Sequence, residues 1–323
     1  MIARKLACVI AALVFAACAA QPAMAQSGYP AKPIRLVIAY APGGPGDILG
    51  RLLADRVSIE LGQTVFVDNR PGGNSTIGTN AVAKAEPDGY TILQVTGAQN
   101  IVKFLQPVPF DFDKDLTPII GVGATPLVLA VPASIKSIDD LIALSKTTQG
   151  GINYGTSGVG SVAHLSAALF TMDRKINATA VPYKGGGPAI QALMANQIQY
   201  FFASPVEAAG LSDSADIRLL AVTSEQRVSN LPKVPTMKEL GLGNNDPRIW
   251  YGYYAPAKTS AAIIDRLYKA FATAMADPAV QTRLQSMGFI VKVDEPAAVT
   301  KFIQAESARW KKVIEENNIK AAD

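Results

Sequence analysis

Cysteine and histidine are scarce in this chain of 323 residues. The two cysteines, Cys8 and Cys18, both lie near the N-terminus, and His164 is the only histidine. The rest of the chain can therefore form neither a disulfide nor a cysteine metal site, so any metal ion would have to be held by carboxylates. No D-x-D-x-D-G calcium loop is present. We expect neither a metal nor a cofactor.

The chain also lacks a large excess of charge. Its formal net charge is +4, and no basic stripe is visible along the sequence, so nucleic acid is not an expected partner. After its first residues the chain contains no apolar segment long enough to cross a membrane. We therefore expect a soluble mature protein.

The first 25 residues have the pattern of a signal peptide. Two basic residues at positions 4 and 5 precede the apolar stretch Leu6–Ala20, and Ala23–Ala25 has the small-x-small form of a cleavage site. We expect export to the periplasm and a mature chain that begins near Gln26. An alternative is lipoprotein processing at Cys18, the end of the sequence "FAAC".

Short β-branched runs alternate with helical patterns through most of the chain. The runs that predict buried strands are Ile34–Tyr40, Thr64–Asn69, Tyr90–Thr96, Ile152–Thr156, Ile198–Ala203 and Ile217–Thr223. Leucine or valine recurs every fourth residue from Leu49 to Leu61 and stops at Gly62, which predicts a helix. This alternation predicts an α/β fold with mainly parallel sheets.

The C-terminal third predicts three consecutive amphipathic helices, over Ile263–Phe271, Pro278–Met287 and Pro296–Asn317. The mature chain exceeds what one core usually covers, which favours two lobes. The long extended stretch Ile119–Pro132 suits a strand that passes between them. With Ile217–Thr223 as the return crossing, we expect a signal peptide at 1–25, lobe I at 26–124 and 223–323, and lobe II at 125–222.

A glycine-rich turn joins the first predicted strand to the first predicted helix. This first elbow, Tyr40–Asp47, reads "YAPGGPGD". Its glycines can expose backbone N–H groups to a ligand, and the helix that follows adds partial positive charge, so the turn suits an anion. We expect Asp47 to cap the helix. Phosphate is a disfavoured ligand because no Lys-Ser or Lys-Thr follows the glycines. The alternative to an anion site is that the glycines only form a tight turn.

Two further elbows repeat this pattern. The second, Thr156–Ser161, is followed by a helix that we expect Ser161 to cap, and the hydroxyls of Thr156 and Ser157 are available to donate. The third, Tyr183–Pro188, contains three successive glycines before Pro188, which suits the first helical position. Three such elbows imply a ligand held between the two lobes.

Two enzyme classes compete for the second elbow. Ser157 lies in "GTSGV", one residue short of the G-x-S-x-G nucleophile pattern, and a helix that begins at Ser161 would direct His164 away from its hydroxyl. Gly158–Ala163 fits G-x-G-x-x-[GA], but no acidic residue follows the next strand as a dinucleotide site requires. The aromatic run Trp250–Tyr254 either lines a cleft or packs at the edge of a sheet.

Six segments resemble the Bug-type substrate-binding receptors of tripartite tricarboxylate transporters. They are "YPAKPIRLVIAYAPGGPGD", "RPGGNSTIGTNAVAKAEPDGYTIL", "YGTSGVGSVAHLSAALF", "VPYKGGGPAIQALMANQI", "IRLLAVTSEQRVSNLPKVPTMKELG" and "WYGYYAPAKTS". The resemblance implies a type II periplasmic binding protein: two α/β lobes, joined by two crossing strands, that close on a small carboxylate. It also implies delivery of that ligand to membrane permease subunits and no enzyme activity, and we expect a monomer.

The resemblance also implies a set of ligand-binding residues. From the first to the third elbow and beyond they are Tyr40, Pro42, Gly43, Gly44, Asp47, Thr156, Ser157, Gly158, Ser161, His164, Tyr183, Lys184, Gly185, Gly186 and Ser204. Many relatives carry an acidic residue where Ala203 and Ser204 stand here, which puts amino-acid ligands in doubt and favours a di-, tri- or aromatic carboxylate. The alternative function is a periplasmic serine hydrolase that uses Ser157.

Overall fold

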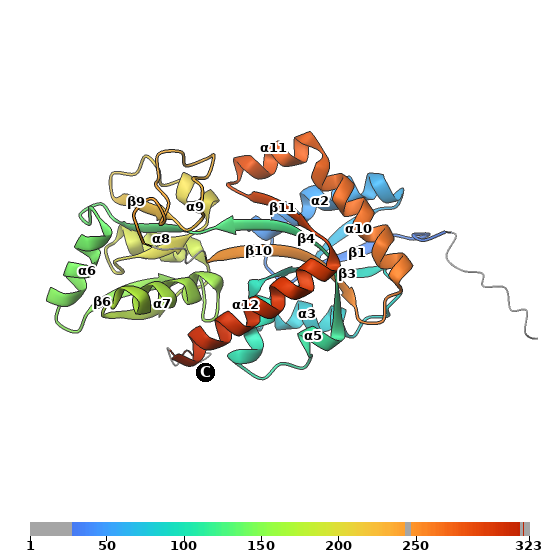
Figure 1. The fold of residues 1–323 in the computed structure, drawn as a ribbon, viewed down its shortest axis with the longest axis horizontal. Coiled ribbons are helices and arrows are strands. Elements are labelled where there is room, and N and C mark those ends of the chain that lie inside the picture. The colour runs from blue at the N-terminus through green and yellow to red at the C-terminus, as the bar shows by residue number, and fades with distance from the viewer. Residues whose placement is uncertain (1–27, 243–246, 317–318, 320–323) are drawn as a thin grey trace, which may run out of the picture. The chain divides into compact units, whose positions relative to one another are not determined.

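The computed structural model describes residues 28–242, 247–316 and 319 (Figure 1). The predicted signal peptide lies outside them. The chain divides into a unit at Met1–Ala31 and a unit at Lys32–Asp323, and every helix and strand described belongs to the second unit. None of the described helices is both long and apolar enough to cross a membrane.

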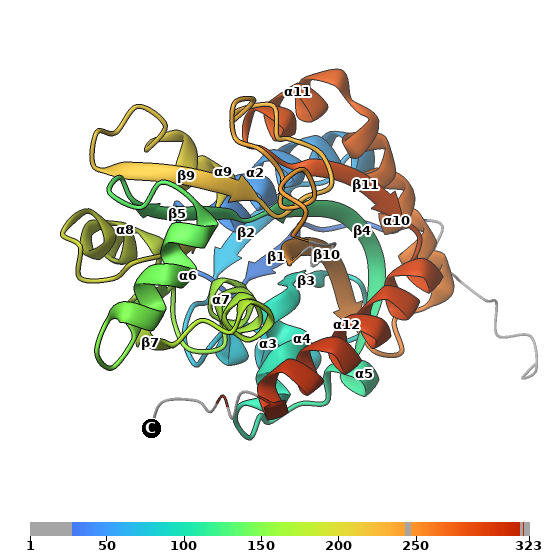
Figure 2. The same cartoon turned by 60° about the vertical axis from the view of Figure 1, so that its left-hand side comes forward.

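Six strands form the larger sheet, in the order β11–β4–β10–β3–β1–β2 (Figure 2). They are β1 (Ile34–Ile38), β2 (Val65–Asn69), β3 (Thr91–Thr96), β4 (Leu116–Pro126), β10 (Arg248–Pro256) and β11 (Ile290–Asp294). β1 pairs in parallel with β2 and β3, whereas β10 is antiparallel to β3 and β4, and β11 is antiparallel to β4. The parallel part is confirmed, and the antiparallel edge comes from the C-terminal third of the chain.

Helices cover both faces of this sheet, which with them forms the first lobe. The helices are α2 (Pro45–Leu61), α3 (Thr76–Ala83), α4 (Gly97–Ile101), α5 (Phe112–Asp115), α10 (Ala261–Ala276), α11 (Pro278–Ser286) and α12 (Pro296–Glu316), with a 3-10 turn at Val102–Phe104. Successive aromatic residues of β10 face opposite sides. Tyr253 packs on Phe271 of α10 at 4.3 Å between ring centroids, whereas Trp250 packs edge-on against Phe302 of α12. The aromatic run of β10 therefore anchors helices on both faces.

Two smaller sheets form the second lobe. One has the order β8–β5–β9 and the other pairs β6 with β7 in parallel. The elements are β5 (Val128–Pro132), α6 (Ile138–Thr147), β6 (Ile152–Thr156), α7 (Val162–Arg174), β7 (Ala178–Pro182), α8 (Gly186–Met194), β8 (Phe201–Ala203), α9 (Pro205–Ala209) and β9 (Ile217–Val222). The predicted strand at Ile198–Ala203 is shortened to three residues, and β11 was not predicted. The sequence patterns above predicted no helix at α3, which begins at Thr76.

The two lobes are connected at Leu127 and near Pro247. Leu127 is the single residue between β4 and β5, and its N–H donates to Thr223 Oγ1 at 2.9 Å. The Thr223 hydroxyl donates to the carbonyl of Pro247 at 2.7 Å. Arg248, the first residue of β10, lies opposite Pro126, the last residue of β4. Two extended segments therefore cross side by side, which fits the predicted two-lobed fold.

The core of the second lobe extends beyond the predicted return crossing. Val228, Leu231, Val234 and Met237 are buried in the same apolar cluster as β5, β8 and β9. We therefore propose that the second lobe runs from about residue 127 to residue 247. The boundary expected at residues 222 and 223 falls inside this cluster because β9 pairs with β5 and remains in that lobe.

Candidate ligand-binding site

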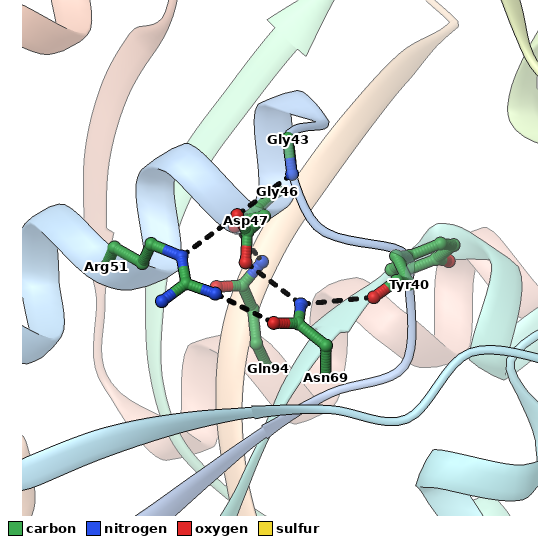
Figure 3. Close-up of polar contacts among 7 residues, drawn as sticks. All are labelled: Tyr40, Gly43, Gly46, Asp47, Arg51, Asn69 and Gln94. Carbon is green, nitrogen blue, oxygen red and sulfur yellow. Dashed lines mark hydrogen bonds and ion pairs between the residues drawn. The ribbon is translucent and has the colours of Figure 1, made fainter.

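The first elbow holds its own carboxylate. Gly44 is the N-cap of α2 and Pro45 its first residue, so Asp47 lies at the third helical position and is not the cap that the sequence predicted. Its side chain reaches back so that Oδ2 accepts the Gly43 N–H at 3.0 Å and Arg51 Nε at 3.0 Å (Figure 3). Asn69 Nδ2 donates to Oδ1 at 2.9 Å. Asp47 thus fixes the shape of the elbow.

This carboxylate stays ionised. Burial alone would raise the pKa of Asp47, but hydrogen bonds from Arg51, Gly43 and Asn69 outweigh burial and hold the pKa below its ordinary value. Tyr40, at the start of the elbow, is half-buried, and its hydroxyl lies 2.7 Å from Thr96 Oγ1. A negative charge therefore already lies at the N-terminus of α2.

The second elbow repeats this geometry with a neutral group. Ser161 caps α7 as predicted, since its hydroxyl oxygen accepts the N–H of His164 at 3.1 Å. His164 lies at the third helical position, like Asp47 in α2, and its Nδ1 accepts the Gly160 N–H at 3.1 Å. Burial lowers the pKa of His164 from 6.5 to about 4, so the imidazole is uncharged at neutral pH.

His164 is poorly arranged to act as a general base for Ser157. Its Nδ1 accepts a backbone N–H, so in the neutral ring the proton sits on Nε2. No hydrogen bond joins it to Ser157 or to a carboxylate among the residues that the structure describes. The geometry required of a nucleophile, base and orienting acid is therefore missing from the described part of the chain.

The third elbow begins its helix earlier than predicted. Gly185 is the N-cap of α8 and Gly186 its first residue, which places Pro188 at the third position. This elbow lies beside the second, because the N–H of Tyr183 donates to the carbonyl of Thr156 at 3.0 Å. Pro188 offers no side-chain acceptor here, so this elbow cannot repeat the contact that Asp47 and His164 make.

Glu207 of α9 supplies the missing carboxylate. A methyl group placed on Gly186 would overlap Glu207 Oε1, so the carboxylate lies directly against the start of α8. The other oxygen, Oε2, accepts the N–H and the hydroxyl of Ser204, each at 2.8 Å. The predicted ligand residue Ser204 is therefore engaged in a capping box with Glu207.

Tyr251 lies beside the first elbow. A methyl group on Gly46 would come within 3.6 Å of Tyr251 Cε1. Burial raises the pKa of the Tyr251 phenol above its ordinary value. Tyr251 of β10 therefore packs as an uncharged side chain beside the first elbow.

The remaining predicted residues differ in how accessible they are. Thr156 is buried, and its Oγ1 accepts the Gly158 N–H at 3.2 Å, so its hydroxyl oxygen shapes the second elbow. Ser157 and Gly158 are half-buried, whereas Pro42 and Lys184 are exposed. Whether each contacts a ligand stays a prediction.

Sequence reasoning missed Glu207 and left Tyr251 undecided. The pattern S-x-x-E at Ser204–Glu207 is a capping-box signature that the sequence displays. It predicts a helix start, but nothing in it predicts the approach of Glu207 to Gly186. Among the described residues no cluster of three or more His, Cys, Asp or Glu could hold a metal ion.

Two α/β lobes joined by paired crossing segments, with one glycine-rich helix start in the first lobe and two in the second, define a periplasmic solute-binding protein. Residues 49–319 match the model of the tripartite tricarboxylate transporter family receptor. The chain belongs to this family, which confirms the resemblance stated above.

Individual relatives are similar to this chain in sequence and structure over nearly its whole length. Protein BugT of Bordetella pertussis is 33% identical over 321 residues, which cover 98% of both chains. A solved protein of R. palustris with adipate is 30% identical, with a TM-score of 0.82 over 91% of this chain and 100% of that chain. MatC of Rhodopseudomonas palustris with bound malate is 28% identical, with a TM-score of 0.78 over 88% and 100%. Family members are thus periplasmic receptors, and these two solved neighbours carry carboxylates.

Proposed function

We propose that this chain is an exported, monomeric receptor that binds a small organic carboxylate between its lobes and delivers it to a tripartite tricarboxylate-type permease. The observation that carries the proposal is a set of three glycine-rich helix starts, two of which, those of the second and third elbows, are joined by a backbone hydrogen bond. The carboxylates in the two solved neighbours support the same ligand class.

The charges at the elbows indicate where the ligand's carboxylate binds. Asp47 and Glu207 place negative charge at the starts of α2 and α8, whereas the start of α7 holds only the neutral His164. An anion gains roughly 0.3–1 kcal/mol from a helix N-terminus, and up to ~2 kcal/mol when the site is partly buried. We assign the ligand carboxylate to the second elbow, with Ser157 as a hydroxyl donor, because it meets no like charge there.

Closure follows from the same arrangement. A ligand that contacts both lobes binds the closed form better than the open form and shifts the hinge equilibrium towards it. The crossing segments at Leu127 and Pro247 are where the backbone would bend. No catalytic step is needed for this function.

Thermal-shift measurements on a panel of organic acids test the proposal. One or a few carboxylates should raise the melting temperature of the purified protein, and mass spectrometry of the protein as isolated should detect a bound acid. Silence across dicarboxylates, tricarboxylates and aromatic acids would contradict it. Ester turnover that disappears in Ser157→Ala would instead favour the hydrolase.

A pair of variants at one position tests the assignment to the second elbow. His164→Asp retains an acceptor for the Gly160 N–H but adds negative charge, and should weaken carboxylate binding at least about tenfold. His164→Asn retains a neutral acceptor and should bind within a few-fold of the wild type. Equal affinities for the two variants, measured by calorimetry, would place the carboxylate elsewhere.

A further inference from the structure

Glu207 carries a negative charge that no cation neutralises among the described residues. Its carboxylate forms none of the ion pairs found in that part of the chain, and the side chain is only half-buried. The Ser204 N–H and hydroxyl both donate to Oε2, so rotation of the carboxylate would break two hydrogen bonds. A fixed, unpaired charge therefore faces the start of α8.

The position of the charge depends on glycine. Any side chain at residue 186 would collide with Glu207 Oε1, and at the N-cap Gly185 has φ 107°, a backbone conformation that also favours glycine. The third elbow is therefore occupied by a carboxylate of the protein itself.

We propose that Glu207 determines ligand specificity: it excludes a second ionised carboxylate from the third elbow and accepts a hydrogen bond from a hydroxyl or ammonium group of the ligand. This inference rests on the proposed function and narrows its ligand class to carboxylates that carry such a donor at their far end. It also reverses the doubt about amino-acid ligands, which arose because Ala203 and Ser204 stand where many relatives carry an acidic residue. In this chain α9 supplies the acidic group.

Two matched ligand series test the inference by calorimetry. One series is hexanoate, 6-hydroxyhexanoate, 6-aminohexanoate and adipate; the other is butyrate, 4-hydroxybutyrate, 4-aminobutyrate and succinate. Within a series only the far group changes, from methyl to hydroxyl, ammonium or carboxylate. The wild type should bind the hydroxyl or ammonium member at least about tenfold tighter than the dianion in whichever series fits the site.

Glu207→Gln should reduce that preference about tenfold or more, mainly by improving dianion binding. Glutamine still offers an oxygen to the Ser204 N–H, and Glu225→Gln, at an exposed residue after β9, is the matched control that should leave the preference unchanged. If Glu207→Gln is less stable than the wild type, two measurements keep the inference testable. One is the order in which the wild type itself binds the members of each ligand series. The other is circular dichroism, which shows whether each variant is folded.

Two results would overturn the inference while leaving the receptor function intact. In the first, the wild type binds the dianion more tightly than any other member of its series. In the second, the preference for the hydroxyl or ammonium member over the dianion is equal in the wild type and Glu207→Gln. A wild type that binds no member of either series and no other organic acid would overturn the receptor function and this inference together.

Discussion

Three acceptor side chains occupy the helix starts of the candidate site, two of them in the same way. Asp47 and His164 are both at the third helical position and accept the N–H of the glycine before the N-cap. Glu207 reaches the third start from a neighbouring helix. Asp47 and His164 thus accept hydrogen bonds from backbone N–H groups that the glycine patterns alone suggested were available to a ligand.

At the residue scale, His164 should make stability depend on pH between about 4 and 6.5. In the unfolded chain its pKa is 6.5, whereas burial holds the folded pKa to about 4, so the unfolded state binds more protons in this window. The free energy of unfolding should therefore fall by about 2–3 kcal/mol as pH drops from 7 to 4.5. Urea denaturation at the two pH values measures this.

His164→Asn is the control, because the chain has no other histidine. In this variant the free energy of unfolding should change little between pH 7 and 4.5. Asparagine does not titrate, and carboxylates with ordinary or lowered pKa remain ionised for most of that range. An equal decrease in the variant would show that His164 is not the group responsible.

At the element scale, α2 packs closely on the sheet through glycine. A methyl group on Gly50 would collide with Ile38 of β1 and lie only 2.6 Å from Gln94 Oε1 of β3. Gln94 Nε2 also donates to the carbonyl of Gly46 at 2.8 Å (Figure 3). The first elbow therefore owes its position to this contact.

Gly50→Ala should destabilise the protein by about 1–3 kcal/mol through overpacking, although alanine is the better helix former by about 1 kcal/mol. Gly210→Ala is the matched control, because its added methyl would meet only Glu207 O at 3.5 Å, an ordinary contact. Chemical denaturation measures both. A Gly50→Ala variant as stable as the wild type would mean that α2 can move off the sheet at no cost.

At the scale of the whole molecule, an apolar cluster connects the lobes away from the crossing segments. Ile101 of α4 and Trp310, Val313 and Ile314 of α12 are buried together with Leu165 and Leu169 of α7. α12 follows β11 in the first lobe, whereas α7 belongs to the second. We therefore expect this cluster to couple the folding of the two lobes.

Leu165→Ala should therefore uncouple the lobes. Both Leu165 and Leu284 are fully buried, but Leu284 lies in α11 within the first lobe. Each truncation should cost about 2–5 kcal/mol, but in calorimetry only Leu165→Ala should broaden or split the unfolding transition. A single sharp transition in both variants would contradict the coupling.

Much of the fold follows from local sequence patterns. The end of α2 was predicted from leucine spacing and Gly62, which takes the left-handed conformation expected of a helix stop, with φ 67°, whereas its start at Pro45 precedes the predicted cap Asp47. Pro278 and Gly288 likewise mark the ends of the second C-terminal helix. β11 was missed because its five residues are short of apolar burial and mostly exposed, so only pairing with β4 makes them a strand.

The sequence by itself determined the receptor family, the α/β alternation and the three glycine elbows, because each is written in short-range spacing and residue type. Only the tertiary structure decided which elbows carry a negative charge, and with it the choice of elbow that we propose for the anion. That choice depends on where Asp47, His164 and Glu207 point, and Glu207 of α9 meets Gly186 of α8 only in the folded chain. Electrostatic repulsion acts through space, so spacing along the chain could not reveal it.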